Sequence, residues 1–277
     1  MKNKGIKGIN IGGENYKCSL LADDTTLFLD DEKSIVNSIS LFKRFQQACG
    51  LKMNMDKSEI IILGKVRKNY IPSAKYGIKW PIEPIKALGQ WVTNDSDVLT
   101  SLNENECLTR IKDSASRLKG LKISLKAKVY LINTKLISPI IFLSSSSYLS
   151  EKVLKEIDNV ISDFMWDSKP PKNKSTVICS EYEDGGLRAP IFSIKYQSLR
   201  TFWIKQCLTD TPQLWKSYLS EMKGNTCKST ILSGSYSRFH PFYSEIFKIS
   251  KTLLHPIDSP QLQSCRKYFS AGILSVF

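Results

Sequence analysis

The chain has 277 residues, of which 42% are hydrophobic and 24% charged, a composition typical of globular proteins rather than disordered or fibrous ones. Its longest apolar run, residues 136–143, is short and is interrupted by Ser138 and Pro139, so the sequence predicts no membrane-spanning helix. The seven cysteines include no CxxC pair, which argues against a zinc ribbon and a secreted disulfide framework. They predict free thiols in an intracellular, reducing compartment, nuclear or cytoplasmic.

The positive charge is concentrated in one segment. The net charge is +14, and residues 110–135 hold eight Lys and Arg residues against one Asp, so half of it lies there. Such a block is typical of proteins that bind a polyanion, most often a nucleic acid. The alternative is a lysine-rich helix face that only contacts water.

The first third of the chain predicts strands and one helix. Strands over 9–11 and 16–21 are followed by Ala-Asp-Asp and a strand over 25–29, so that the acidic pair lies at a hairpin tip. The spacing of apolar residues then predicts a helix that Ser34 caps and Gly50 ends. A buried strand over 59–63 and a strand or hairpin around Gly89, over 85–92, complete this part.

From residue 104 onward the pattern is helical. We expect a helix that ends near Gly120, a second one from Ser124 to Pro139, and a third over 151–166. Further helices are predicted over 194–208 and 214–222, whereas residues 224–277 show no readable periodicity. Strands followed by helices predict an α+β fold with a helical second domain.

The acidic pair Asp23 and Asp24 is the first feature that indicates chemistry. Acidic residues are common in tight turns, where Asp bonds its own backbone, and three letters alone favour that explanation. Apolar strands on both sides, however, place the two carboxylates on rigid backbone. Hard divalent cations need such oxygen ligands, and two magnesium ions are the usual machinery of phosphoryl transfer.

Several segments, in order, resemble the reverse transcriptases of LINE-type (non-LTR) retrotransposons. Cys18-Ser-Leu-Leu-Ala-Asp-Asp-Thr-Thr-Leu-Phe-Leu is similar to the strand–Tyr-Ala-Asp-Asp–strand motif of that family. The other segments that match, within residues 5–208, are Cys49-Gly-Leu-Lys-Met-Asn-Met-Asp-Lys-Ser-Glu, Lys86-Ala-Leu-Gly-Gln-Trp-Val, Ser124-Leu-Lys-Ala-Lys-Val-Tyr-Leu-Ile-Asn, Phe164-Met-Trp and Gly185-Gly-Leu-Arg-Ala-Pro.

The resemblance implies RNA-templated DNA synthesis with Mg²⁺ and dNTPs on an RNA template and a DNA primer, and no membrane partner. It implies that Asp23 binds metal, that Asp24 is its less directly engaged neighbour, and that Lys57 helps pyrophosphate to leave. An exposed turn lysine is the simpler explanation of Lys57. Residues 1–92 would be the C-terminal part of the palm, residues 93–150 the thumb, and residues 151–277 a helical connection.

The same resemblance implies a nucleic-acid surface. Gly89 would let a primer-gripping hairpin approach the backbone, although a simple tight turn also explains it. The residues expected to contact phosphates of an RNA–DNA hybrid are Lys119, Lys122, Lys126 and Lys128.

The departures from the family pattern leave two rival hypotheses open. Leu21 replaces the usual aromatic residue, Ala127 replaces Gly, and Met1 falls just before the hairpin, so that fingers and an upstream palm strand with a further Asp are expected to be missing. We therefore expect the chain alone to be inactive. The rivals are a non-catalytic nucleic-acid-binding remnant and an inert product of a decayed copy.

No zinc site is expected. The wide separation of Cys227, His240, His255 and Cys265 does not suit a compact finger.

Overall fold

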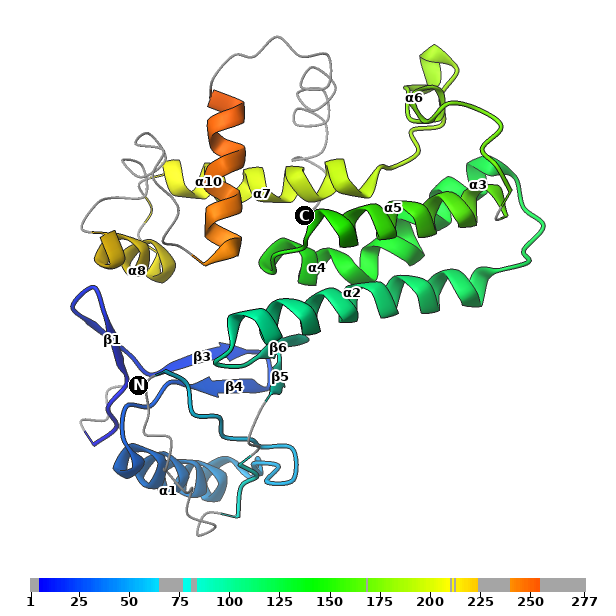
Figure 1. Cartoon of the computed structure of the whole chain (residues 1–277). Helices are drawn as coiled ribbons and strands as arrows, with labels where there is room; N and C mark the ends of the chain where they lie inside the picture. Colours follow the sequence, from blue (N-terminus) through cyan, green and yellow to red (C-terminus); the bar gives the residue numbers. More distant parts are fainter. Residues whose placement is uncertain are drawn as a thin grey trace. The chain divides into compact units, whose positions relative to one another are not determined.

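The computed structural model describes residues 5–64, 77–80, 84–167, 169–209, 211, 213–223 and 240–254. These residues form a mixed α and β structure with small antiparallel sheets, which is compatible with the predicted α+β class (Figure 1). The chain divides into two compact units. Unit 1 comprises residues 1–85 and 210–229, and unit 2 comprises residues 86–209 and 230–277.

Two short antiparallel hairpins begin unit 1. Strands β1 (Ile9–Ile11) and β2 (Glu14–Tyr16) form the first, and β3 (Cys18–Leu21) and β4 (Asp24–Leu27) form the second. The predicted strand over 16–21 is therefore interrupted at Lys17, where the chain passes from one hairpin to the other.

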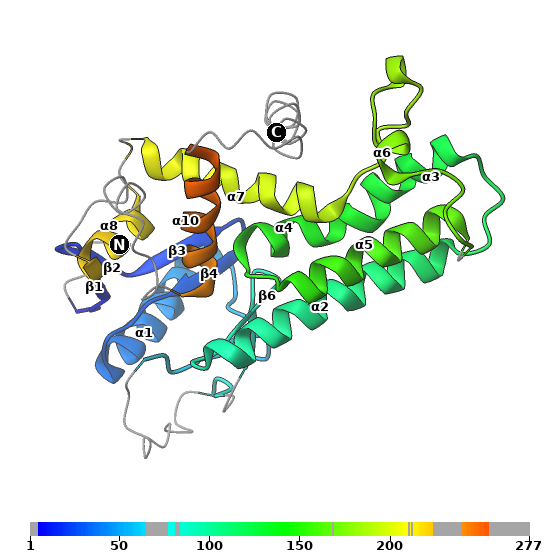
Figure 2. The ribbon, with the colours of Figure 1, turned by 45° about the horizontal axis from the view of Figure 1, so that its top comes forward.

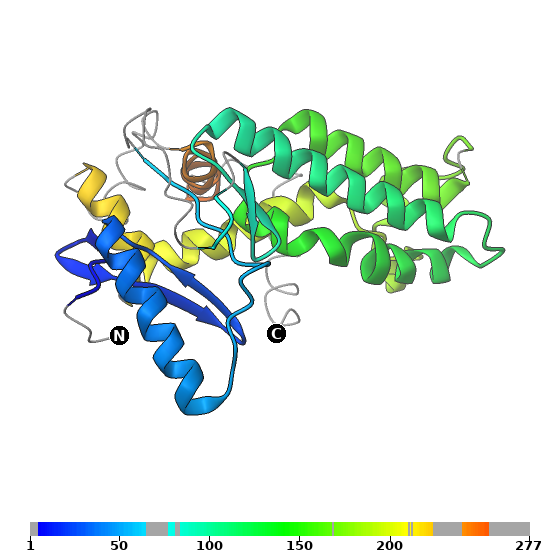
Figure 3. The same ribbon diagram turned by 90° about the horizontal axis from the view of Figure 1, so that it is seen from below.

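Helix α1 (Glu32–Cys49) follows, and its predicted first cap is wrong. The extended residue before it is Asp31, whose Oδ1 accepts a hydrogen bond of 2.7 Å from the backbone N–H of Ser34. Ser34 lies inside the first turn, where its buried hydroxyl accepts from the N–H of Lys7. Gly50 ends the helix with a φ of 75°, as predicted. Figure 3 shows α1 beside the two hairpins of unit 1.

The predicted buried strand over 59–63 is absent from the described structure. That segment contributes one isolated bridge, between Glu59 and Lys79, and its residues are half-buried or exposed. The hairpin around Gly89 is confirmed as β5 (Ile85–Ala87) and β6 (Gln90–Val92). Leu88 and Gly89 both have positive φ, which matches the turn type that suits a two-residue hairpin.

The main framework of unit 2 consists of long helices. Helix α2 (Ser96–Leu118) begins earlier than predicted because the side chain of Asp95 accepts hydrogen bonds from Asp97 and Val98. Helix α5 (Glu151–Trp166) has the predicted bounds. Figure 2 shows α2 and α5 side by side, next to the helix that connects them.

That connecting helix runs past Pro139, contrary to prediction. It consists of α3 (Leu125–Leu131), a π-helical segment (Ile132–Ile137) and α4 (Ser138–Ser146). A proline ring collides with the carbonyl four residues earlier in an α-helix. The wider π-helical turns directly before Ser138 accommodate Pro139 without ending the helix. The predicted cap is confirmed, because Ser124 Oγ accepts from the N–H of Ala127 at 3.3 Å.

This continuous helix also corrects the expectation about apolar length. By length and composition alone it could cross a membrane, with 22 residues and a mean hydropathy of 1.2. Its fully buried residues, among them Ile132, Leu136 and Leu143, belong to the core of unit 2. A core helix satisfies the same criterion.

Four further helices and one short 3-10 segment complete the described chain. The 3-10 segment spans Tyr182–Asp184, and the helices are α6 (Ser175–Ile178), α7 (Phe192–Leu208), α8 (Leu214–Lys223) and α10 (Pro241–Leu254). Helix α8 packs against β1 within unit 1, whereas α10 crosses α7 within unit 2 (Figures 1 and 2). Helix α10 falls within the segment that had no readable periodicity.

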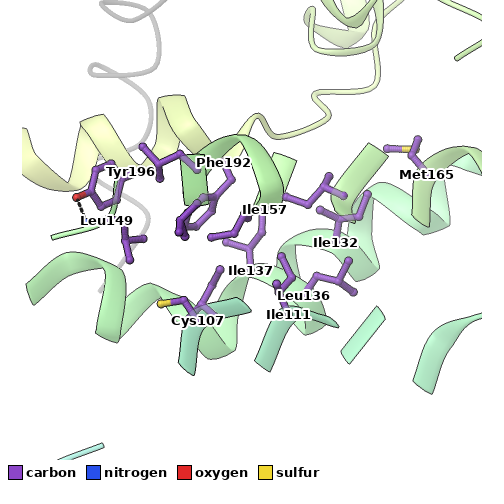
Figure 4. Close-up of a cluster of buried hydrophobic side chains, with 14 of the residues drawn as sticks. Cys107, Ile111, Ile132, Leu136, Ile137, Leu149, Ile157, Met165, Phe192 and Tyr196 are labelled. Carbon is purple, nitrogen blue, oxygen red and sulfur yellow. Dashed lines mark hydrogen bonds between the residues drawn. The ribbon is translucent and has the colours of Figure 1, made fainter. Parts of the chain in front are cut away.

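The core of unit 2 lies between α2, the connecting helix, α5 and α7. Ile111, Leu136, Ile157 and Phe192 are fully buried there, and Figure 4 shows their side chains gathered between the helices.

A buried arginine joins α7 to α10 and to the end of α4. Arg200 is completely buried and donates hydrogen bonds to the carbonyls of Ser145 and Ser147, to Tyr196 Oη and to Glu245 Oε2. Burial raises the pKa of Glu245, because the charged form loses hydration, although Arg200 opposes this effect.

Candidate functional site

The acidic pair lies at the tip of the β3–β4 hairpin. Leu21 pairs with Asp24, so the loop consists of Ala22 and Asp23 alone. Ala22 has a φ of 52°, a conformation that non-glycine residues rarely adopt. A two-residue loop with positive φ at its first position usually contains glycine there. The backbone strain is therefore at Ala22, directly before Asp23, and such strain often occurs at functional sites.

Both carboxylates are accessible. Asp23, Asp24 and the neighbouring Thr25 are exposed, and Leu20 and Leu21 beside them are 69% and 60% exposed. Strands β3 and β4 pair only with each other among the described residues. Two acidic residues and two leucines are therefore accessible to a ligand or to another protein segment at the hairpin tip.

The donor chemistry of this tip suits magnesium. Two carboxylates supply only oxygen ligands, and Mg²⁺ is commonly bound through one or two carboxylates, with waters and substrate phosphates completing its octahedron. Within the described ranges, no group of three or more His, Cys, Asp or Glu residues gathers into a metal site. Asp23 and Asp24 could thus hold the ion as two ligands of a set that other groups complete. Of the residues considered for zinc, Cys227, His255 and Cys265 lie outside the described residues.

Lys57 lies on an exposed turn of unit 1. Asn54 Oδ1 accepts a hydrogen bond of 3.2 Å from the backbone N–H of Lys57, so Asn54 caps this turn. Lys57 forms no ion pair with Asp23 or Asp24, all three of which lie in the described part of unit 1. The structure therefore places Lys57 on the same unit as the acidic pair without bringing the side chains into contact.

The hairpin that contains Gly89 is fixed to unit 2 by polar contacts that the sequence did not indicate. Glu106 accepts from both Lys86 and Arg110, at 2.9 and 2.8 Å. Burial raises the pKa of Glu106, but these two hydrogen bonds outweigh it and leave the pKa below its usual value. Asn103, which is buried, accepts from the N–H of Trp91 at 3.1 Å. Gly89 is thus an exposed turn residue on an anchored hairpin.

Three of the four predicted phosphate-binding lysines are exposed. Lys119 and Lys122 lie in the turn between α2 and α3, and Lys126 lies in the first turn of α3. Lys126 Nζ is also 5.3 Å from the ring centre of Tyr182. These three side chains form the accessible basic end of the connecting helix.

The placement of Lys128 on that basic surface is wrong. Its side chain is 5% exposed, and its ammonium donates to the carbonyl of Met165 and to Asp167 Oδ1 at 3.2 and 2.5 Å. The hydrogen bond from Lys128 chiefly lowers the pKa of Asp167. Lys128 therefore joins α3 to the C-terminal end of α5, where a cation is favourable, instead of facing a nucleic acid.

Two of the remaining basic residues of the segment 110–135 are paired with carboxylates. Arg110 is paired with Glu106, and Lys112 is paired with Glu156. The net charge of the segment thus overstates the positive charge that is free to bind a polyanion.

A scan against protein-family models finds no family that matches this chain.

Proposed function

We propose that the chain supplies the acidic hairpin and the helical thumb of an RNA-templated DNA polymerase of the LINE type. The observation that supports this most is the strained two-residue turn at Ala22, which presents Asp23 and Asp24 at an exposed tip. The anchored Gly89 hairpin and the exposed lysines are further features that such an enzyme uses to hold a primer and a template.

In this proposal Asp23 and Asp24 hold Mg²⁺, which supplies charge stabilisation to the transferring phosphoryl group. Mg²⁺ dehydrates reluctantly, so two neighbouring carboxylates alone bind it weakly and leave it most of its waters. We therefore propose that a further Asp on an upstream palm strand, as the resemblance implies, completes the site. Leu20 and Leu21 are exposed, which is compatible with a further strand or helix that packs on this hairpin.

Primer extension on an RNA template with magnesium and dNTPs tests the proposal. We expect no extension by the chain alone and extension by the chain joined to a palm and fingers segment of the same family. Asp23→Asn in the joined protein should abolish extension, Lys57→Ala should slow it less, and Asp30→Asn, at an exposed position outside the matching segments, should leave it unchanged. Undiminished synthesis by the Asp23→Asn protein would contradict the metal assignment.

A non-catalytic nucleic-acid-binding function is the second hypothesis, and the exposure of Lys119, Lys122 and Lys126 favours it. Three engaged lysines give a slope of about −2 to −3 in log K against log salt. If the joined protein binds with such a slope but never extends a primer, this hypothesis is preferred. A binding constant that does not depend on salt would contradict it.

A further inference from the structure

The connecting helix carries a row of exposed residues at every fourth position. Its members are Lys126, Tyr130, Thr134, Ser138 and Phe142. Tyr130 is 68% exposed and Phe142 is 54% exposed. Two large aromatic side chains therefore face solvent on a helix whose other side forms the core of unit 2.

The π-helical segment is the reason that these residues share a face. A regular α-helix has 3.6 residues per turn, so positions four apart drift around it by about 40° at each step. The wider turns of Ile132–Ile137 offset this drift. Tyr130 and Phe142 consequently lie on the same side, separated by at most roughly 18 Å along the axis, the value for an α-helical rise of 1.5 Å per residue.

The chemistry of this row is basic and aromatic. Residues 125–146 contain no Asp or Glu, whereas Lys126 and Lys135 are exposed. The hydroxyl of Thr134 donates a hydrogen bond of 2.9 Å to the carbonyl of Tyr130, so its proton is already satisfied within the helix. A positively charged track with aromatic platforms is how many proteins bind single strands, because every base has a face that can stack.

The row also connects the two parts of unit 2 that are proposed to contact nucleic acid, namely the basic turn before α3 and the Gly89 hairpin. At one end lies the turn that contains Lys119 and Lys122. At the other end, Arg110 donates to the carbonyls of Gly89 and Pro139, at 3.4 and 3.3 Å. The tip of the β5–β6 hairpin is thereby held next to the turn of α4 that precedes Phe142.

We propose that this row, with the neighbouring exposed Lys135, binds single-stranded nucleic acid, so that Tyr130 and Phe142 stack on bases and Lys126 and Lys135 contact phosphates. A stacked strand advances 3.4 Å per nucleotide, so the two rings span about five nucleotides. The inference rests on the proposed function, because it identifies the nucleic acid that this surface holds, but it requires no catalysis. A lipid surface fits less well, since three of the five positions are polar and a membrane-bound helix presents an apolar face.

Fluorescence anisotropy with two labelled oligonucleotides tests the inference. One is an ordinary single strand, and the other has the same length and phosphates but abasic sites throughout. The protein should bind the ordinary strand more tightly. Tyr130→Ala with Phe142→Ala removes two stacking contacts, so it should weaken that binding at least about 30-fold and leave binding to the abasic strand unaffected. Tyr130→Phe with Phe142→Tyr should retain it.

Two further variants separate base stacking from phosphate contacts and from general effects of removing an aromatic side chain. Lys126→Ala should weaken binding to both strands alike and reduce the slope of log K against log salt by about 0.7 in magnitude. Phe45→Ala removes an aromatic side chain that is 55% exposed on α1, and it should change neither affinity. The thermal midpoints of all variants should match that of the unchanged protein, because each side chain is exposed.

Three outcomes would overturn the inference. These are equal losses for the ordinary and abasic strands in the alanine variant, no loss for either strand, and binding to phosphatidylserine vesicles that depends on Tyr130 and Phe142 in place of binding to the strand. Any of these outcomes in a joined protein that still extends a primer refutes this inference and leaves the proposed function intact. Aromatic-dependent binding without extension in the joined protein refutes the polymerase and supports the inference.

Discussion

The two units of the chain differ in how they bury apolar side chains. In unit 2, long helices enclose a continuous core that includes Ile111, Leu136 and Ile157. In the described part of unit 1, the fully buried hydrophobic residues are Ile6 and Leu219, and the β3–β4 hairpin leaves Leu20 exposed. Two-stranded hairpins are only marginally stable alone. Stability is therefore concentrated in unit 2, whereas the acidic pair lies in the unit with the smaller described core.

The largest effect on this comparison should come from Arg200→Ala. It leaves the half-buried Glu245 without its cation and removes donors from the carbonyls of Ser145 and Ser147, of which only Ser145 keeps another, from Trp203, so we expect a loss of about 3–5 kcal/mol in the free energy of unfolding. Urea denaturation measures it. Lys205→Ala, at an exposed position of the same helix, is the control, and equal losses for the two variants would contradict the role of Arg200.

A pair of apolar truncations compares the two units directly. Ile157→Ala should cost about 2–5 kcal/mol, because it removes a fully buried side chain and leaves a cavity. Leu20→Ala should change stability by no more than about 0.5 kcal/mol, because that side chain is already exposed. Chemical denaturation of both variants provides the values. A larger loss for Leu20→Ala would reverse the comparison.

Lys128→Ala distinguishes a structural lysine from a surface one. Removing it leaves the carbonyl of Met165 without its buried donor, and we expect a loss of about 1–3 kcal/mol. Lys126→Ala, two residues earlier and exposed, should have little effect on stability. Thermal unfolding of the two variants tests this, and a lower midpoint for Lys126→Ala than for Lys128→Ala would refute the assignment.

The smallest effect concerns the cap of α1 in unit 1. Hydrogen bonds from Ser34 lower the pKa of Asp31 from its ordinary value of 3.8. Because the folded pKa is below the unfolded one, the carboxylate stabilises the fold above pH 3.8, and this contribution is lost as the pH falls through the folded pKa. Denaturation of the unchanged protein and of Asp31→Asn across this range should show a difference that is present at neutral pH and vanishes in acid. A difference that does not vary with pH would contradict the assigned shift.

The elements that sequence predicted well are those specified by local patterns. Helix α5 has regularly spaced apolar residues, and its predicted bounds match the structure. The Gly89 hairpin was likewise evident, because glycine at a two-residue turn satisfies a positive φ. The acidic pair was placed at a hairpin tip for the same local reason, namely that strand-forming residues flank it.

The predictions that failed depended on choices between similar local signals or on distant partners. Asp31 and Ser34 are both good caps, and only the structure shows which one precedes the helix. Pro139 usually ends a helix, but the π-helical segment is not visible in a pattern. Lys128 has the same local signals as Lys126, and its burial depends on Asp167, which is 39 residues away.

The contact between β1 and α8 has a consequence for synthesis of the chain. Gly12 donates a backbone hydrogen bond of 3.1 Å to Glu221, 209 residues later, and it approaches Ser217 so closely that a Cβ at Gly12 would lie 3.0 Å from the serine Cβ. At the ribosome, about 5–20 residues are added each second, so the first hairpin waits roughly 10–40 s for this partner. Residues 86–209 of unit 2 are made in that interval, so the first hairpin acquires its contact with α8 only after most of unit 2 has been synthesised.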